Sequence, residues 1–490
     1  MNQNKIKPNV LDRFIGFFSP QQQFKRVVAR QKVARKYEGA SSTRRTKGWS
    51  TSNASSAAET YRSLDALRNR SRDLIQNNTY AKRGCDAIVN NVVGKGIYPQ
   101  IIDDKSQSRA EKIGQIFKNW MMSTECDFEM TKNFFMLQRL ITRATFESGE
   151  CLVVRRYSSS KEYQYAPLNL QILEPDHLDS TGYYSKPASG NKLIQGIEYN
   201  SQGRRVAYHV FKEHPGGLSP SRETIRIDAS DVIHVFDELR PGQVRGVPYL
   251  APAIIKLRDY DEYEDAQLMR QKIASCFAGF IKDMELPDDG EYSDDEQELL
   301  EKIEPGTLEV LPPGKDISFP NTPAVEGISD FSKISLRAVA SALGISYEAL
   351  TMDYSNVNFS SGRMGWIEMH RTIEDFRNNV IMPKFLDQVF MWFLESVSFL
   401  GVKTENINWS WTPPKREMID PSAEIASMIE GMQAGIMTLS GTLQSMGIDP
   451  EDHIKQLKND LDLLDKYGLK LSSDPRNPQK DLSTKQSSGG

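Results

Sequence analysis

Two helical patterns in this sequence are longer than a compact domain requires. The first runs from Pro248 to about Lys282, and Pro248 suits the first turn of a helix. At 1.5 Å per residue this helix would be roughly 50 Å long. The second runs from Ser361 to Leu400, and Pro383 near its middle predicts a kink because proline removes a backbone hydrogen bond. Helices of this length need partners, which neighbouring copies of the chain would supply.

The composition limits the class of protein. A chain of 490 residues predicts several structural units, and 39% hydrophobic with 26% charged residues is typical of a folded protein with a large hydrated surface. The net charge of −4 excludes a globally basic nucleic-acid coat. The four cysteines form no C-x-x-C pair, which favours reduced thiols. No apolar run has membrane-spanning length and the N-terminus lacks a secretory pattern, so we expect no membrane partner and assembly in a cytoplasm.

Residues 1–59 are predicted to form a basic, flexible arm that ends in a Ser/Thr/Ala-rich stretch. A solvated terminus and a segment that binds DNA or an acidic partner fit this pattern equally well. Only Asp12 and Glu38 oppose the cations before residue 51. These cations are Lys5, Lys7, Arg13, Lys25, Arg26, Arg30, Lys32, Arg35, Lys36, Arg44, Arg45 and Lys47.

Residues 60–247 are predicted to form an α+β domain in which helices precede strands. The first helix spans 61–76, and Thr79, Ser106 and Thr131 are the expected N-caps of the next three. Short runs rich in β-branched and aromatic residues follow and predict a mostly antiparallel sheet. These runs are 151–156, 169–173, 194–199, 205–211, 224–227 and 232–236.

The remainder of the chain is mainly helical. Residues 283–329 form a small acidic module with a predicted strand pair, 307–311 and 316–319. Asp330 is the expected cap of a helix that ends at Gly344, and residues 345–360 are polar and partly irregular. Asp-Pro pairs at 420–421 and 449–450 predict helices over roughly 421–445 and 450–467. Residues 471–490 have the composition of a disordered tail.

Motifs of catalysis and metal binding are missing from the sequence, which disfavours an enzyme. There is no G-x-x-x-x-G-K-[ST], no H-E-x-x-H and no G-x-S-x-G. Glu174, Asp176 and His177 lie within four residues, but candidate ligands on one turn without a second group are a weak metal pattern. We therefore expect no metal and no cofactor. His209 and His234 lie in predicted strands and are interpreted as structural.

Several segments together resemble the lambda family of phage portal proteins. Each is modest alone, but their order and spacing over about residues 60–465 make the combination specific. The family commonly has tyrosine where this chain has Phe359, a change that keeps the aromatic ring and loses a hydroxyl. The segments are Asn90–Gly96, Glu174–Asp176, Arg240–Pro248, Leu308–Gly314, Leu343–Ser355 and Asn358–Ser361.

The resemblance implies an α+β, mainly helical portal fold that assembles as a ring. Its parts would be the arm 1–59, a wing 60–247, a first stem helix 248–282, a clip 283–329, a second stem helix 330–344, a tunnel loop 345–360, a kinked tunnel helix 361–400, a helical crown 401–470 and the tail 471–490.

The resemblance also implies a function and partners. Twelve copies would form a ring at one capsid vertex, a conduit for double-stranded DNA during packaging and ejection. The ring would contact the major capsid protein and scaffold, and it would dock the terminase large subunit and then a head–tail adaptor. It would belong to the virion after assembly in the host cytoplasm. ATP hydrolysis would be supplied by terminase, so the chain itself would not be an enzyme.

A conduit must let DNA slide, because each cation that neutralises a phosphate adds affinity. The tunnel segment fits this requirement with weak polar contacts from Asp353, Ser355, Asn356 and Asn358 and with sparse phosphate guides at Arg363 and Arg371. The alternative is that these residues cap and solvate the start of a helix.

The acidic clip is the expected contact for terminase and then the adaptor, although a solvated surface fits its composition equally well. The acidic residues expected to make this contact are Asp288, Asp289, Glu291, Asp294, Asp295 and Glu296.

Two alternatives stay open. One is a different head–tail connector such as an adaptor ring, which the length of the chain and its stem–clip–stem order disfavour. The other is an enzyme that acts on nucleic acid or on the capsid, such as a nuclease or a maturation protease.

Overall fold

The computed structural model describes residues 10–33, 44, 47–49, 51–103, 105–158, 163–181, 184–185, 190–218, 221–275, 280–283, 315–318, 327–414, 417–469, 471 and 476. The chain divides into two compact units, Met1–Ser55 and Ser56–Gly490. Among the described helices, none has the length and apolar character needed to cross a membrane.

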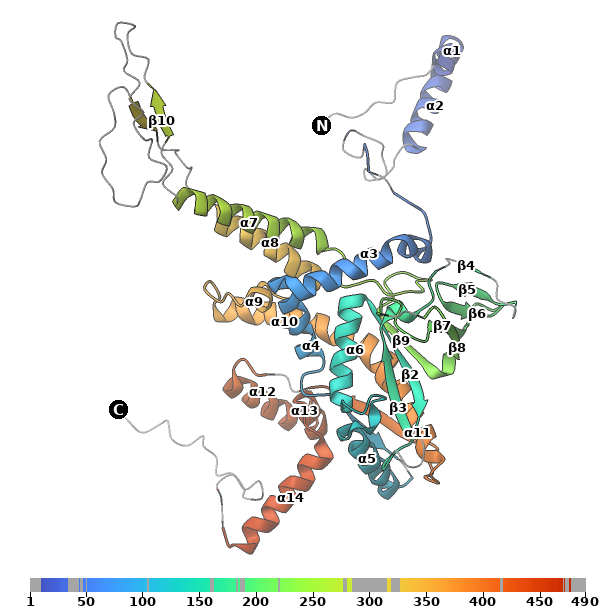
Figure 1. Ribbon diagram of the computed structural model, residues 1–490, viewed down its shortest axis with the longest axis vertical. Coiled ribbons are helices and arrows are strands. Elements are labelled where there is room, and N and C mark those ends of the chain that lie inside the picture. The colour runs from blue at the N-terminus through green and yellow to red at the C-terminus, as the bar shows by residue number, and fades with distance from the viewer. Residues whose placement is uncertain are drawn as a thin grey trace, which may run out of the picture. The chain divides into compact units, whose positions relative to one another are not determined.

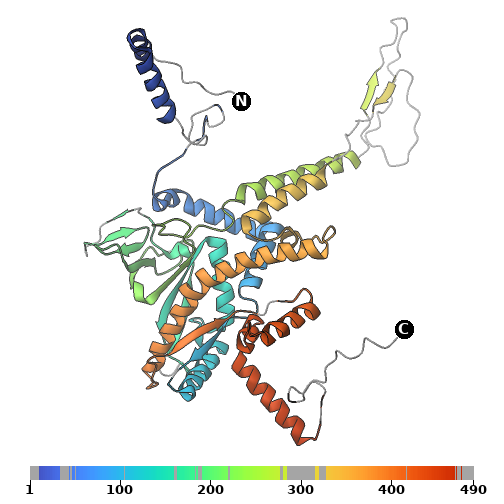
Figure 2. The ribbon, with the colours of Figure 1, turned by 180° about the vertical axis from the view of Figure 1, so that it is seen from behind.

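The described residues of the first unit include two helices, α1 (Val10–Phe18) and α2 (Pro20–Val33), which are labelled in Figure 1 and drawn in dark blue in Figure 2. Ser19 joins them, since its N–H donates to the carbonyl of Ile15 at 2.8 Å and its carbonyl accepts from Gln23 at 3.2 Å. Proline suits the first turn of α2 because that position needs no N–H donor. The prediction of a flexible arm overlooked these helices.

The second unit begins with four helices that the sequence patterns predicted. They are α3 (Ser56–Asn77), α4 (Thr79–Val92), α5 (Gln107–Met122) and α6 (Phe134–Ser148). The fold starts four residues before the predicted Thr60, because the carbonyl of buried Ala57 accepts a hydrogen bond from buried Gln195 at 2.8 Å.

The N-caps of these helices only partly match the prediction. Ser106 caps α5 as predicted, but Asn78 caps α4 in place of Thr79, and Asn133 caps α6 in place of Thr131. The side chain of Thr131 is engaged elsewhere, because its hydroxyl and N–H both donate to the buried carboxylate of Asp127.

The strands predicted between residues 151 and 236 form two antiparallel sheets, whereas one sheet was predicted. The first has the order β3 (Leu168–Leu173), β2 (Glu150–Tyr157), β9 (Val232–Phe236). The second has the order β4 (Tyr184–Ser185), β5 (Lys192–Ile194), β6 (Ile197–Tyr199), β7 (Arg205–Phe211), β8 (Thr224–Asp228). Short 3₁₀ helices lie at Thr124–Cys126 (η2), Pro175–His177 (η3) and Ala229–Asp231 (η4).

Strand β2 is the reason that the sheet divides. Cys151 and Val153 face the main core, whereas Leu152 and Val154 face a second apolar cluster that includes residues of β6, β7 and β9. Because side chains alternate across a strand, β2 is buried on both faces, with helices on one side and the second sheet on the other.

The first long helix is shorter than predicted at both ends. It is α7 (Ile254–Ser275), and its start is delayed because residues 248–253 form turns around Pro252. Residues 280–282, predicted to be helical, belong instead to β10 (Phe280–Asp283), which pairs with β11 (Lys315–Ser318). The predicted strand 307–311 lies outside the described residues. Helix α8 (Ile328–Leu343) begins earlier than predicted, so Asp330 lies in its first turn and does not cap it; Gly344 ends the helix as predicted, at φ 67°.

The second long helical pattern is confirmed, although it begins and ends two residues earlier than predicted. The loop predicted at 345–360 contains α9 (Tyr347–Thr351), and the helix begins at Phe359. It comprises α10 (Phe359–Phe376), a π-helical stretch η5 (Arg377–Leu386) and α11 (Asp387–Ser398). Pro383 lies within η5, so the distortion expected at this proline takes the form of wider helical turns.

The C-terminal part contains one strand and three helices. Strand β12 (Asn408–Thr412) pairs with β1 (Tyr98–Ile102), which the sequence analysis did not predict. The helices are α12 (Pro421–Gln433), α13 (Leu439–Ser445) and α14 (Pro450–Lys466), with Asp420 and Asp449 as caps, as predicted. The single helix predicted over 421–445 is wrong, because Gly435 has a φ of 71° and Thr438 caps a new helix.

Candidate tunnel segment and buried ion cluster

The predicted tunnel segment begins where α9 ends. Asp353 closes this turn, since its carboxylate accepts from the N–H of Ser355 at 3.0 Å, from the Ser355 hydroxyl at 2.6 Å and from the Tyr347 hydroxyl at 3.3 Å. The hydrogen bond from the Ser355 hydroxyl is the main reason that the pKa of Asp353 lies below its usual value. Asp353 is therefore a charged acceptor with a structural role in the turn.

Asn358 caps α10 through a reciprocal pair of hydrogen bonds. Its side chain accepts from the N–H of Ser361 at 2.8 Å, and its own N–H donates to the Ser361 hydroxyl at 3.2 Å. Exposed Asn356 donates a long hydrogen bond to the Ser355 hydroxyl, 3.4 Å from nitrogen to oxygen. The local hydrogen bonds thus account for Asp353 and Asn358 without DNA, and contact of these residues with DNA stays a prediction.

The two predicted phosphate guides both lie exposed on α10. Arg371 forms an ion pair with Glu368 at 2.6 Å. Arg363 has no ion pair with any residue that the structure describes. With 1.5 Å rise per residue, the two arginines lie about 12 Å apart along the helix axis. Arg363 is thus the more available cation of the pair.

Exposed apolar side chains accompany these polar residues, and the sequence analysis did not single them out as a group. Met352, Tyr354, Phe359 and Met364 are 54%, 59%, 58% and 71% exposed. The aromatic ring at 359, noted in the family resemblance, was the available signal. The acidic clip residues lie outside the described residues. They are Asp288, Asp289, Glu291, Asp294, Asp295 and Glu296.

A buried ion cluster lies where α3, β2, β9 and the segment before α7 meet, and sequence reasoning missed it. The carboxylate of Glu150 is fully buried. Its Oε1 accepts from Arg68 at 3.0 Å and from Arg245 at 2.8 Å. Its Oε2 accepts from the N–H of Gly246 at 2.7 Å and contacts Nε2 of His234 at 2.8 Å. One carboxylate therefore joins four segments of chain.

The protonation states in this cluster follow from burial and charge. Burial acts to raise the pKa of Glu150, but the charge of Arg245 and the hydrogen bond from His234 outweigh it and hold the pKa below its usual value. Burial lowers the pKa of His234 to about 4, against the opposing effect of its hydrogen bond to Glu150. His234 is therefore neutral near pH 7 and donates from Nε2, as a structural histidine.

Two glycines make room for this cluster. A Cβ atom on Gly246 would lie 2.1 Å from the carbonyl oxygen of Gly149, and one on Gly149 would lie 2.4 Å from the carbonyl carbon of Val247. Gly149 also has a φ of 86° as the C-cap of α6. The backbones cross so closely that neither position accepts a side chain. The Arg-Gly pair at 245–246 lies in a segment that carries the family resemblance.

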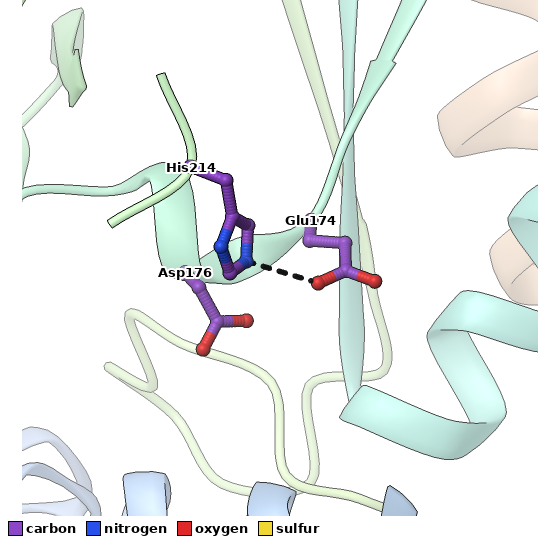
Figure 3. A group of neighbouring side chains, drawn as sticks. All are labelled: Glu174, Asp176 and His214. Atoms are coloured by element: carbon purple, nitrogen blue, oxygen red, sulfur yellow. Dashed lines mark ion pairs between the residues drawn. The ribbon is translucent and has the colours of Figure 1, made fainter. Parts of the chain in front are cut away.

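Glu174, Asp176 and His214 form a group whose potential ligand atoms lie within 4.8 Å of one another (Figure 3). His177, the candidate from the sequence, instead places its Nδ1 3.1 Å from the carbonyl oxygen of Phe211. Both carboxylates already have cationic partners: Arg72 lies 2.5 Å from Asp176 and 3.3 Å from Glu174. This neutralisation makes the group a poor site for a divalent cation.

Comparison with known proteins places this chain in a family. A model described as phage portal protein, lambda family, matches residues 42–377. A probable portal protein of Halomonas phage phiHAP-1 is 28% identical over 464 residues, which cover 89% of this chain and 88% of the relative. Portal protein B of Escherichia phage lambda is 20% identical over 439 residues, covering 79% and 81%.

Among solved structures, a chain in the neck of a native gene transfer agent particle is 13% identical and has a TM-score of 0.47, covering 79% of this chain and 94% of that one. Because the family model matches more than half of the 490 residues, this chain belongs to the lambda family of phage portal proteins.

Proposed function

We propose that twelve copies of this chain close into a ring at one capsid vertex and that double-stranded DNA passes through its centre during packaging and ejection. Head-to-tail contacts between identical copies give a closed ring when the rotation per contact closes. The ring serves as a conduit without enzymatic turnover of its own, assembled in the host cytoplasm and retained in the virion. Family membership supports this proposal.

The single structural observation that carries the ring is the pair α7 and α8, which lie side by side (Figures 1 and 2). The rings of Tyr263 and Phe331, 4.4 Å apart, join the two helices. Although the exposed surface of α7 is mainly charged over Arg258–Asp265, apolar side chains are exposed on both helices: Leu268, Met269 and Ile334 are 50%, 59% and 67% exposed. Neighbouring copies would cover these side chains, as large exposed apolar surfaces mark interfaces.

The parts of the family plan are assigned to the structure as follows. The wing corresponds to residues 56–247, the stem to α7 and α8, and the clip to the chain between them. The tunnel segment covers the loop 345–360 and the kinked helix 361–400, and the crown covers 401–470. Terminase and then the adaptor dock at the acidic clip, and the capsid protein and scaffold surround the ring. The acidic sequence of the clip supports this docking site.

The tunnel contacts DNA weakly. Each subunit contributes Arg363 and Arg371 as sparse cations, Asp353 as a negative charge that opposes tight binding, and Asn358 as a weak polar contact. Each cation that neutralises a phosphate adds affinity for DNA. A tunnel with few cations therefore holds DNA weakly and lets it slide. Replacement of Ser355 and Asn356 by lysine would therefore slow packaging, measured as DNA packaged per time in a terminase-driven reaction.

The experiment for the ring is electron microscopy of the purified full chain viewed end-on, together with its mass in solution. The expected result is a closed ring with a hole wide enough for B-form DNA. Met269→Glu with Ile334→Glu should prevent ring closure, whereas Leu239→Glu, also on an exposed apolar residue, should not. A folded monomer under assembly conditions, or an annulus too narrow for a duplex, would contradict the proposal.

Two further measurements separate the alternatives. An adaptor ring would give a similar micrograph but would not bind terminase in a pull-down, whereas the portal ring binds it. Cleavage of DNA or of capsid protein by the purified chain alone would favour the enzyme.

A further inference from the structure

Helix α1 has an apolar face that no described residue of its unit covers. Leu11, Phe14, Ile15 and Phe18 follow the i, i+3, i+4, i+7 spacing of one helix face. Leu11, Phe14 and Phe18 are 61%, 70% and 74% exposed, and Phe17 beside them is 85% exposed. The rings of Phe14 and Phe18 lie 5.7 Å apart, so these aromatic side chains form a contiguous patch.

Helix α2 repeats the pattern with a basic polar side. Phe24 is 70% exposed, and Val28 follows it at i+4. Arg26 and Arg30 occupy positions on the opposite side of the helical wheel, and Lys25 and Lys32 flank the apolar pair. An aromatic and aliphatic face bordered by lysines and opposed by arginines is the pattern of helices that lie in the plane of a membrane interface.

The charge of this unit indicates the chemistry of its partner. Twelve cations oppose Asp12 and Glu38 before residue 51, so the partner is polyanionic. Duplex DNA would satisfy the cations but would leave the aromatic face in water, since protein contacts to DNA go mainly to phosphates and polar base edges. A bilayer with anionic headgroups satisfies both faces at once.

We propose that α1 and α2 bind the surface of an anionic lipid bilayer, with the aromatic face at the boundary between headgroups and acyl chains. The expectation of no membrane partner rested on the lack of a spanning apolar run, which bears on helices that cross a bilayer and not on helices that lie in its surface. The proposal does not depend on the ring.

Binding at a bilayer would have a consequence for assembly. Copies held in one plane with the same orientation meet at a higher effective concentration than copies in solution. Anionic membranes would therefore promote the first contacts between subunits.

The experiment is co-sedimentation of the full chain with vesicles of phosphatidylcholine alone or of phosphatidylcholine with phosphatidylglycerol. We expect at least about tenfold stronger binding to the anionic vesicles, because each cation near the surface adds attraction. Phe14→Ser with Phe18→Ser should abolish binding to both vesicles. Lys25→Ser with Arg30→Ser should remove the preference for anionic lipid. A matched control outside the unit, Phe399→Ser, replaces a residue 70% exposed on α11's C-terminal side and should leave binding unchanged.

Several outcomes would overturn the proposal. Equal binding to both kinds of vesicle would remove the charge argument, and full binding by the double phenylalanine variant would remove the argument from the aromatic face. Binding of a short DNA duplex without any binding to vesicles would identify nucleic acid as the partner of this unit.

Discussion

Glu150→Gln tests whether the buried ion cluster holds the wing together. The substitution keeps the shape of the side chain and removes its charge. Arg245, 0% exposed, would then be buried without the carboxylate that balances it, and Arg68, 2% exposed, would keep only Asp176 at 3.6 Å and Asp65 at 3.7 Å. Removing one partner of a buried ion pair costs about 3–5 kcal/mol, since the remaining charge stays desolvated.

The hydrogen bonds support a value in this range. The amide oxygen of glutamine can replace Oε1 and accept from both arginines, without the charge. The amide nitrogen would take the place of Oε2, where the Gly246 N–H lies at 2.7 Å and His234 Nε2 at 2.8 Å. The Gly246 N–H would then face another donor, whereas neutral His234 can change tautomer and accept at Nε2. An unsatisfied buried donor costs about 1–3 kcal/mol.

Thermal unfolding followed by circular dichroism is the assay, at one fixed protein concentration because assembly shifts apparent stability by mass action. A loss of about 3–5 kcal/mol predicts a Tm lowered by roughly 3–5 °C in a chain of this size, because the entropy of unfolding grows with chain length. The control is Glu368→Gln, which breaks the exposed pair with Arg371 and should cost under about 1 kcal/mol. A Glu150→Gln chain that unfolds within about 2 °C of the parent would refute the reasoning.

Three other predictions follow from local geometry. Because burial lowers the pKa of His234 to about 4, the unfolded chain binds a proton that the folded chain does not as pH falls below about 6.5, so Tm should fall between about pH 6.5 and pH 4. His234→Gln should flatten that part of the Tm profile. Gly246→Ala would place a Cβ 2.1 Å from a backbone oxygen and should abolish soluble folded protein, whereas Gly114→Ala meets nothing nearer than 3.8 Å and should be tolerated. Asn358→Ala should cost about 1 kcal/mol in a denaturant titration, and Asn356→Ala almost nothing.

Helix caps and strand bounds that depend on residues close together in the chain could be predicted from the sequence. Ser106, Asp420 and Asp449 cap their helices as predicted, because a capping side chain bonds to a backbone N–H two or three residues away. Strands β7 and β9 have the predicted bounds for a similar reason, since β-branched runs between turn residues are a local pattern.

Contacts between segments that are distant in the chain could not be predicted from the sequence. Strands β1 and β12 pair although roughly 300 residues separate them, and each alone is a short run with weak strand character. Glu150 bonds to Arg68 across 82 residues and to Arg245 across 95. The sequence alone does not distinguish a buried glutamate at the start of a strand from a solvated one, because the fold is what brings two arginines to Glu150. The candidate tunnel residues show the converse: a local pattern explains their hydrogen bonds, whereas the contact with DNA that we propose for them would depend on other copies of the chain.

The ion cluster also fixes the segment that leads into α7, the proposed first stem helix. Gly246 donates to Glu150, and three residues later the N–H of Tyr249 donates to the carbonyl of Phe146 at 3.1 Å, with the two rings stacked 5.5 Å apart. The Tyr249 hydroxyl donates to Asp237 at 3.0 Å, so the chain is fixed to β9's end and to α6 just before α7 begins. The direction in which α7 leaves the wing is therefore set by buried contacts. In a ring, each subunit must present its stem at the same angle for the last contact to close. A Glu150→Gln chain that still folds should consequently form rings of mixed subunit number or open arcs in end-on micrographs.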